Sequence, residues 1–150
     1  MYSDLKVLGS LLTGYQASRV LVVSRHPNAQ ALSQSRAAKN LTQAGVGFES
    51  WLCGPSEPAS VQLAQAVAQA ARECKAQAVV GIGDGGIIDL SKAAAALAPQ
   101  PERIPVHEFT ATRRGVRAIS PETSLPFAAL PTTATTAGAV DNTCLVHICF

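Results

Sequence analysis

A glycine-rich segment, residues 81–86, has the composition of a ligand-binding loop. It holds four glycines and Asp84, and an alanine-rich helical pattern over 86–98 follows it directly. A strand, a glycine turn and a helix in this order direct backbone N–H groups and the positive end of a helix towards an anion. The glycines match neither the GxGxxG fingerprint nor a P-loop. Two interpretations stay open at this point: a phosphate-binding loop or a tight structural turn.

A second loop, residues 131–138, carries four threonines. Their hydroxyls can donate to phosphates or a ribose, or they can cap a helix and satisfy turn carbonyls. Asp89 and Lys92, one helical turn apart, form a further candidate pair. The alternative for this pair is a local ion pair with an acid placed favourably near a helix N-terminus. Each of these features is therefore ambiguous when it is taken alone.

The elements that position these loops alternate between helix and strand along the chain. Hydrophobic periodicity and turn residues predict helices over 3–15, 28–44, 61–75 and 86–98, and strands over 19–24, 46–52, 76–83 and 126–133. This repetition favours an α/β fold, a Rossmann-like parallel sheet with helices on both faces. Ligands bind at the carboxyl ends of the strands in such sheets. Both candidate loops follow predicted strands, so we expect them at the same binding edge.

We expect a single domain over 1–150, because its length suits one hydrophobic core. Five prolines within 99–126 predict an irregular excursion there, with at most a short strand near 104–107. The last segment, 143–150, is apolar and favours β-structure. Ser60 is expected to cap the helix 61–75, and Gly45 to end the helix 28–44.

Composition excludes several classes of partner. The formal net charge is +2, and one basic cluster in a proline-containing loop lacks interleaved aromatic residues, so no nucleic-acid partner is expected. No apolar run is long enough to cross a membrane and no secretory signal is seen, which favours a cytoplasmic protein. The four cysteines include no CxxC pair, which favours reduced thiols that form no disulfide and have no chemical role. No cluster of residues has the spacing of a metal site.

Taken together, the two loops resemble the iron-containing (group III) alcohol dehydrogenases of the dehydroquinate synthase-like superfamily. That family has V-G-G-G-S-x-x-D-x-x-K followed by P-T-T-A-G-T-G-S-E-V. This chain has I-G-D-G-G-I-I-D-L-S-K at 82–92 and P-T-T-A-T-T-A-G-A-V at 131–140, in the same order and at a similar separation. The opening helix and strand and the S-E-P turn at 56–58 are also similar to the family, so the resemblance covers nearly the whole chain.

The resemblance implies a nucleotide-binding half of an oxidoreductase that transfers hydride between NAD(P) and a small alcohol or aldehyde. A homo-oligomer is a further expectation. The family's Fe²⁺ or Zn²⁺ ligands belong to a second, helical domain, which we expect to be missing here, so we expect the chain alone to be inactive. An arginine after the first strand, Arg25, suits the 2′-phosphate of NADP better than a hydroxyl, which slightly favours NADP over NAD. By matching position, the cofactor-binding residues are Arg25, Gly83, Asp84, Gly85, Gly86, Asp89, Lys92, Thr132, Thr133 and Thr136.

Asp84 departs from the family pattern, because it stands where the family has a glycine. A carboxylate facing a pyrophosphate costs affinity unless it points away. A non-catalytic nucleotide-binding or interaction module is therefore one alternative function. A dehydroquinate synthase-like lyase is another, supported by Val140 and Asp141, which partly match that enzyme's second loop.

Overall fold

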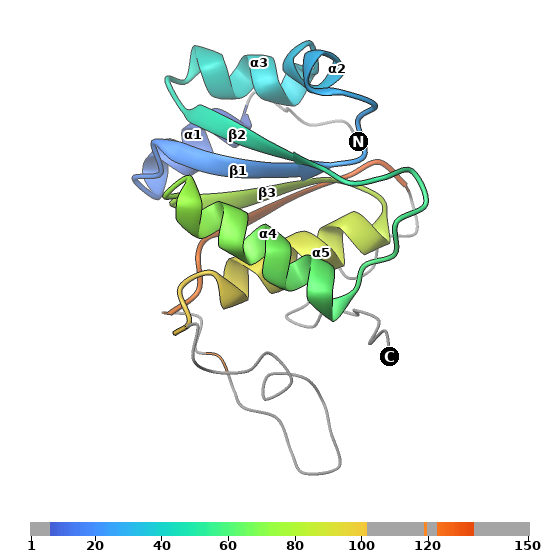
Figure 1. Ribbon diagram of the computed structural model, residues 1–150. Coiled ribbons are helices and arrows are strands. Elements are labelled where there is room, and N and C mark those ends of the chain that lie inside the picture. Colours follow the sequence, from blue (N-terminus) through green and yellow to red (C-terminus); the bar gives the residue numbers. More distant parts are fainter. Residues whose placement is uncertain (1–6, 102–118, 120–122, 134–150) are drawn as a thin grey trace.

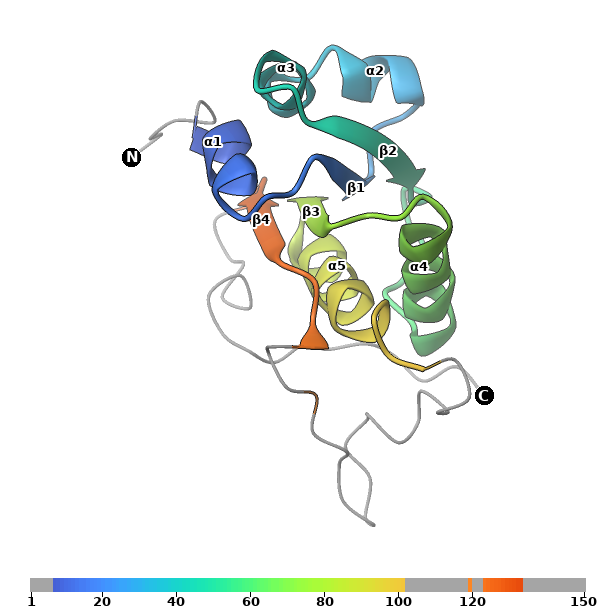
Figure 2. The ribbon, with the colours of Figure 1, turned by 90° about the vertical axis from the view of Figure 1, so that its left-hand side faces the viewer.

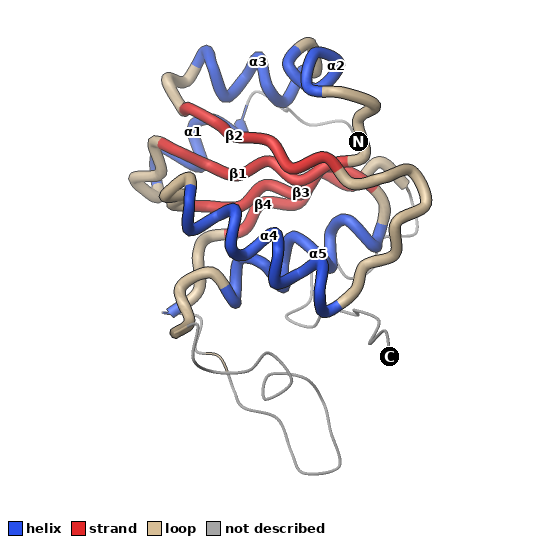
Figure 3. The backbone as a smooth tube through the Cα atoms, viewed as in Figure 1, coloured by secondary structure: helices blue, strands red, loops and turns tan. Residues whose placement is uncertain are grey.

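The computed structural model describes residues 7–101, 119 and 123–133, and these form a four-stranded parallel sheet between two layers of helices (Figures 1 and 3). The strands lie in the order β2-β1-β3-β4, and every neighbouring pair is parallel. The strands are β1 (Arg19–Ser24), β2 (Gly47–Leu52), β3 (Ala78–Gly83) and β4 (Phe127–Pro131). The helices are α1 (Val7–Gly14), α2 (Ala29–Ser33), α3 (Arg36–Gln43), α4 (Val61–Glu73) and α5 (Gly85–Leu97). The predicted α/β class is confirmed.

The two faces of the sheet are covered by different helices (Figure 2). Helices α1 and α3 pack on one face, where Leu12 and Leu41 join Val20 and Val22 of β1 in one hydrophobic cluster. Helices α4 and α5 pack on the other face, against the alternate residues of β1 and β3. Because side chains alternate along a strand, a strand covered on both faces is apolar throughout. This explains the unbroken apolar run in β1.

One predicted helix is wrong in its extent, because residues 28–44 form two short helices. Helix α2 ends at Ser33, and α3 begins after Ser35. Ser35 has an extended backbone, with φ −64° and ψ 154°, and its hydroxyl accepts a hydrogen bond from the Ala38 N–H at 3.2 Å. Serine competes for backbone donors in this way, which favours a helix start over a helix interior.

Two predicted helix boundaries are confirmed. Ser60 is the N-cap of α4, and its hydroxyl accepts a hydrogen bond from the Leu63 N–H at 3.1 Å. Gly45 follows α3 with a φ of 72°, in the left-handed region that favours glycine at a helix end. The expected strand at 104–107, the apolar run 143–150 and most of the excursion 99–126 lie outside the described residues. No helix of the described part of the chain is long and apolar enough to cross a membrane.

Candidate functional site

The strand order reverses direction between β1 and β3. From β1 the chain moves outward to β2 and then returns to place β3 on the opposite side of β1. Loops that leave the carboxyl ends of two such strands diverge to opposite sides of the sheet, and the crevice between them is where open α/β sheets bind ligands. In this chain the two loops begin at Arg25 and Asp84, directly after β1 and β3. Both residues were expected to bind the cofactor, and both lie at the carboxyl ends of the two strands that flank this reversal.

Asp84 is the N-cap of α5. Its backbone is extended, with φ −74° and ψ −179°, and one carboxylate oxygen accepts a hydrogen bond from the Ile87 N–H at 3.1 Å. An N-cap carboxylate satisfies a free N–H group of the first turn and interacts favourably with the helix dipole. The side chain of Asp84 therefore turns back onto its own helix and occupies the position in front of the α5 N-terminus.

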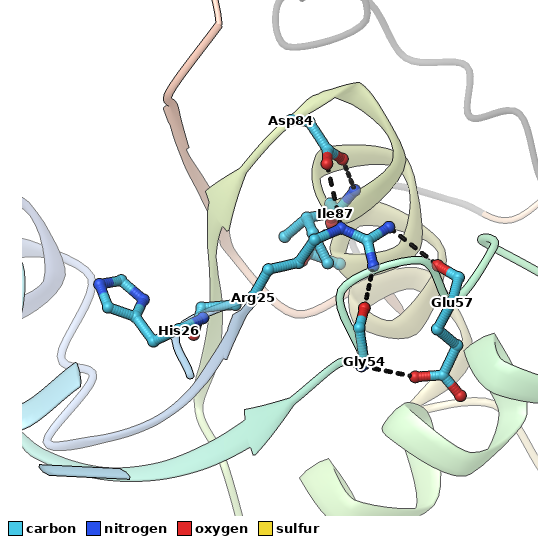
Figure 4. Close-up of polar contacts among 8 residues, drawn as sticks. Arg25, His26, Gly54, Glu57, Asp84 and Ile87 are labelled. Carbon is cyan, nitrogen blue, oxygen red and sulfur yellow. Dashed lines mark hydrogen bonds and ion pairs between the residues drawn. The ribbon is translucent and has the colours of Figure 1, made fainter. Parts of the chain in front are cut away.

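Arg25 crosses from β1 to meet this carboxylate (Figure 4). Its Nε–H donates to Asp84 Oδ2 at 3.0 Å. On its other side the guanidinium donates through Nη1 to the carbonyl of Gly54 and through Nη2 to the carbonyl of Glu57, the latter at 2.8 Å. The neighbouring His26 ring points away from this cluster (Figure 4). Arg25 thus joins the loops that follow β1, β2 and β3.

The loop after β2 also stabilises itself. The Glu57 carboxylate accepts a hydrogen bond from the Gly54 N–H at 3.0 Å, so the two carbonyls that hold Arg25 belong to one closed turn. We did not predict Gly54 and Glu57 as site residues. Their contribution to Arg25 is through backbone carbonyls, which every residue type carries, so the sequence holds no side-chain signal for it. Two signals were available: the loop also leaves the carboxyl edge of the sheet, and it contains the S-E-P turn at 56–58 that resembles the family's.

The electrostatics of the pair favour the charged form of Asp84. Burial raises the pKa of Asp84, but the hydrogen bond from the Ile87 N–H and the Arg25 guanidinium outweigh it and hold the pKa below its ordinary value. The two side chains are 21% and 43% exposed, for Arg25 and Asp84 respectively, so solvent still reaches the carboxylate. A partly exposed pair of this kind contributes modestly to stability.

The ion pair predicts a pH-dependent stability difference between the wild type and Asp84→Asn. Because the folded-state pKa is lowered, the pair stabilises the fold above the unfolded-state pKa, and this contribution is lost as the pH falls through the folded-state pKa. The asparagine keeps an N-cap oxygen but not the charge. Urea denaturation should therefore show the wild type as the more stable protein at pH 7, with a difference that shrinks below about pH 4. A difference independent of pH contradicts the ion pair.

The glycines of the loop differ in what the fold requires of them. A Cβ atom on Gly83 would lie 2.9 Å from both Cβ and Cγ1 of Ile87, so a side chain there would clash. One on Gly86 would lie 3.3 Å from a carboxylate oxygen of Asp84. At Gly85, apart from the chain neighbours and the backbone of its own helix, no atom of the described residues lies within 4 Å of the added carbon, and φ is not in the left-handed region. The described residues leave room for a side chain at Gly85, and the lack of one keeps the first turn of α5 open on that side.

The two candidate loops begin side by side. Gly83 of β3 is paired with Pro131 of β4, and the Thr132 N–H donates to the Gly83 carbonyl at 2.8 Å. Thr132 and Thr133 are both exposed at this edge. Thr136, also expected to bind the cofactor, lies outside the described residues.

Asp89 and Lys92 lie further along α5. Both are half-buried, and neither lacks an interaction partner. Asp89 is one helical turn, and Lys92 about two turns, beyond the start of α5, and both therefore lie further along the helix than the N-cap Asp84. Their expected role beside a cofactor stays a prediction.

The two cysteines of the described part of the chain are free and have the character of buried thiols. Burial, followed by the nearby Glu57 carboxylate, raises the pKa of Cys53 to about 11. Burial also raises the pKa of Cys74, which is half-buried. Both thiols are thus protonated and poor nucleophiles at neutral pH. Within the described residues, no group of three or more histidine, cysteine, aspartate or glutamate side chains is placed to hold a metal ion.

Comparison with known proteins identifies relatives of this chain. The family model of the iron-containing alcohol dehydrogenases matches residues 3–148. The chain is also similar to the probable alcohol dehydrogenase EutG of Salmonella typhimurium, with 32% identity over 111 residues. This match covers 73% of the chain and 26% of the relative, so the chain spans about a quarter of the relative's length.

Solved structures share the fold. An archaeal, halo-thermophilic alcohol dehydrogenase from a Red Sea brine pool matches with a TM-score of 0.73 and 23% identity, over 86% of this chain and 32% of that one. Sulfoacetaldehyde reductase from Bifidobacterium kashiwanohense, solved in complex with NAD⁺, matches with a TM-score of 0.66 and 23% identity, over 88% of this chain and 33% of that one. The structural match shows the shared fold, and the family model covers almost every residue. The chain therefore belongs to the iron-containing alcohol dehydrogenase family.

Proposed function

We propose that this chain is the nucleotide-binding half of an NAD(P)-dependent alcohol dehydrogenase or aldehyde reductase. The observation that carries the proposal is Gly85, where the described residues leave room for a side chain, at the start of a helix beside the reversal of strand order. Glycine at such a position lets the backbone approach a pyrophosphate closely. Family membership and the relative solved with NAD⁺ support the same class of ligand.

The chain's own residues would bind and orient the dinucleotide. The N–H groups at the start of α5 suit a phosphate, and the exposed hydroxyls of Thr132 and Thr133 suit a phosphate or a ribose. A bound nicotinamide supplies or accepts hydride. Arg25 is the basis for favouring NADP over NAD, but its guanidinium already donates to three protein acceptors. A preference for NADP therefore requires Arg25 to exchange Asp84 for the 2′-phosphate.

The metal and the substrate belong to the larger enzyme in this proposal. By resemblance to the family, Fe²⁺ or Zn²⁺ would be held by residues of a second, helical domain. The substrate would be a small alcohol or aldehyde whose oxygen the metal polarises. Catalysis by this chain alone is therefore not expected.

Titration of the chain with NADH and with NADPH, followed by nicotinamide fluorescence, tests the proposal. We expect saturable binding of at least one cofactor. Gly85→Ala should weaken that binding about tenfold, equal to about 1.4 kcal/mol, because the methyl group fills the approach to α5. The same variant should keep or slightly raise stability, by about 0.4–1 kcal/mol, because alanine restricts the unfolded chain.

Two results would count against nucleotide binding. The first is the absence of saturable binding with either cofactor. The second is a Gly85→Ala variant that binds as tightly as the wild type, because the glycine would then have no role towards a ligand. Urea denaturation of both proteins shows whether any loss of binding comes from unfolding.

The pair between Arg25 and Asp84 favours a second candidate function, a non-catalytic interaction module. In this chain the carboxylate of Asp84 already lies at the helix N-terminus, where it accepts from the Ile87 N–H and pairs with Arg25. This alternative expects no cofactor binding in the titration above, even in variants of Asp84 that fold normally.

A further inference from the structure

The Asp84 carboxylate is held by the two groups that a nucleotide phosphate would also use. One of its oxygens accepts from the Ile87 N–H of α5, and the other accepts from Arg25 Nε–H. Helix N-terminal N–H groups and arginine are both strong partners of phosphate oxygens. The carboxylate thus lies between an anion-binding helix end and a guanidinium, at the reversal of strand order.

Arg25 is also held by two acceptors other than Asp84. The carbonyls of Gly54 and Glu57 fix the outer two nitrogens of the guanidinium, and the Glu57 carboxylate in turn closes that turn onto the Gly54 N–H. The Nε–H is therefore directed towards the α5 N-terminus whatever anion lies there. Removal of the carboxylate would leave a prepared donor, not a freely moving side chain.

Capping alone does not explain an aspartate at this position. Serine and asparagine cap a helix about as well as aspartate does, and neither brings a charge to a site expected to bind phosphate. The charge of Asp84 is used in the structure by Arg25, which lies 59 residues away in sequence. The negative charge of Asp84 therefore has a role in the contact with Arg25 that helix capping does not require.

We propose that Asp84 is an internal competitor for the nucleotide's phosphate, and that its contact with Arg25 is autoinhibitory. This inference rests on the proposed nucleotide-binding function and concerns the regulation of the same site. Two anions sharing the space between Arg25 and α5 repel each other, so binding requires the carboxylate to leave. Asp84 is 43% exposed, which gives its side chain a route to solvent. The wild type consequently binds its cofactor more weakly than the fold allows.

Asp84→Asn tests this competition, with Glu73→Gln as the matched control. Asparagine keeps the N-cap oxygen and removes the charge. Glu73 ends α4 at the opposite edge of the sheet, where it accepts a hydrogen bond from the Gln69 amide at 3.1 Å, so its replacement removes one negative charge far from the site. The probes are NADH, NADPH and inorganic pyrophosphate, each titrated into the full chain by calorimetry.

We expect Asp84→Asn to bind NADH or NADPH, and also pyrophosphate, at least about tenfold more tightly than the wild type, with Glu73→Gln unchanged. Asp84→Ser, which also keeps a capping oxygen, should show the same gain. Equal affinity of the wild type and both Asp84 variants for a dinucleotide would overturn the inference and leave nucleotide binding in place. A gain for pyrophosphate without saturable dinucleotide binding would support the competition and overturn the proposed function. No binding of any probe by any variant would overturn both.

Discussion

Gly83→Ala should lower the free energy of unfolding by about 1–3 kcal/mol, the usual cost of forcing extra carbon into a packed site. The added Cβ would lie 2.9 Å from Cβ and Cγ1 of Ile87. Ile87 is fully buried and branched at Cβ, so its side chain has little freedom to move aside. Relief requires α5 to shift relative to β3, which also displaces the Asp84 cap. Urea denaturation measures the loss.

Gly85→Ala is the matched control, because it makes the same change two residues further on. Apart from its chain neighbours and the backbone of α5, no atom of the described residues lies within 4 Å of the added carbon, so stability should be kept or slightly raised. If both variants lose the same stability, the claim that Gly83 is tightly packed and Gly85 is not is contradicted. If neither does, α5 adjusts to Gly83→Ala without cost.

Leu12→Ala should lower the free energy of unfolding by about 2–5 kcal/mol, because it leaves a cavity between α1 and the sheet. Leu12 is 3% exposed and packs in the cluster that contains Leu41 and the inner residues of β1. Its neighbour Leu11 is 54% exposed on the same helix. Leu11→Ala should therefore change stability by less than about 0.5 kcal/mol. The free energies of unfolding of the two variants, measured by heat or urea, show which face of α1 is buried against the sheet.

The strands and several helix ends follow from local rules. The strand at 19–24 has the predicted bounds, because a run of β-branched and apolar residues can be buried on both faces only in a covered sheet. The caps at Ser60 and Gly45 depend on hydrogen bonds and backbone angles within a few residues. The common edge of the two candidate loops follows from the parallel sheet, in which the carboxyl ends of the strands point the same way.

The break at Ser35 shows where such rules are insufficient. The apolar periodicity over 28–44 suits one helix, and serine is tolerated inside helices. In the structure the Ser35 hydroxyl accepts a hydrogen bond from the Ala38 N–H. Helices α2 and α3 are two distinct helices on the same side of the sheet (Figure 1). Local patterns permit both arrangements, and the structure has the one in which Ser35 caps α3.

Some features of the candidate site are visible in the sequence, and others depend on the tertiary structure. Its glycines, the threonines and the charged residues Arg25 and Asp84 are recognisable by type and by spacing, because phosphate binding needs close backbone approach and hydrogen-bond donors. The contact between Arg25 and Asp84 is not, because the two residues are 59 positions apart and meet only when β3 lies next to β1. The carbonyls of Gly54 and Glu57 that hold the guanidinium carry no side-chain signal at all. Tertiary structure therefore turned a residue expected to bind a 2′-phosphate into the counter-ion of the aspartate at the helix N-terminus.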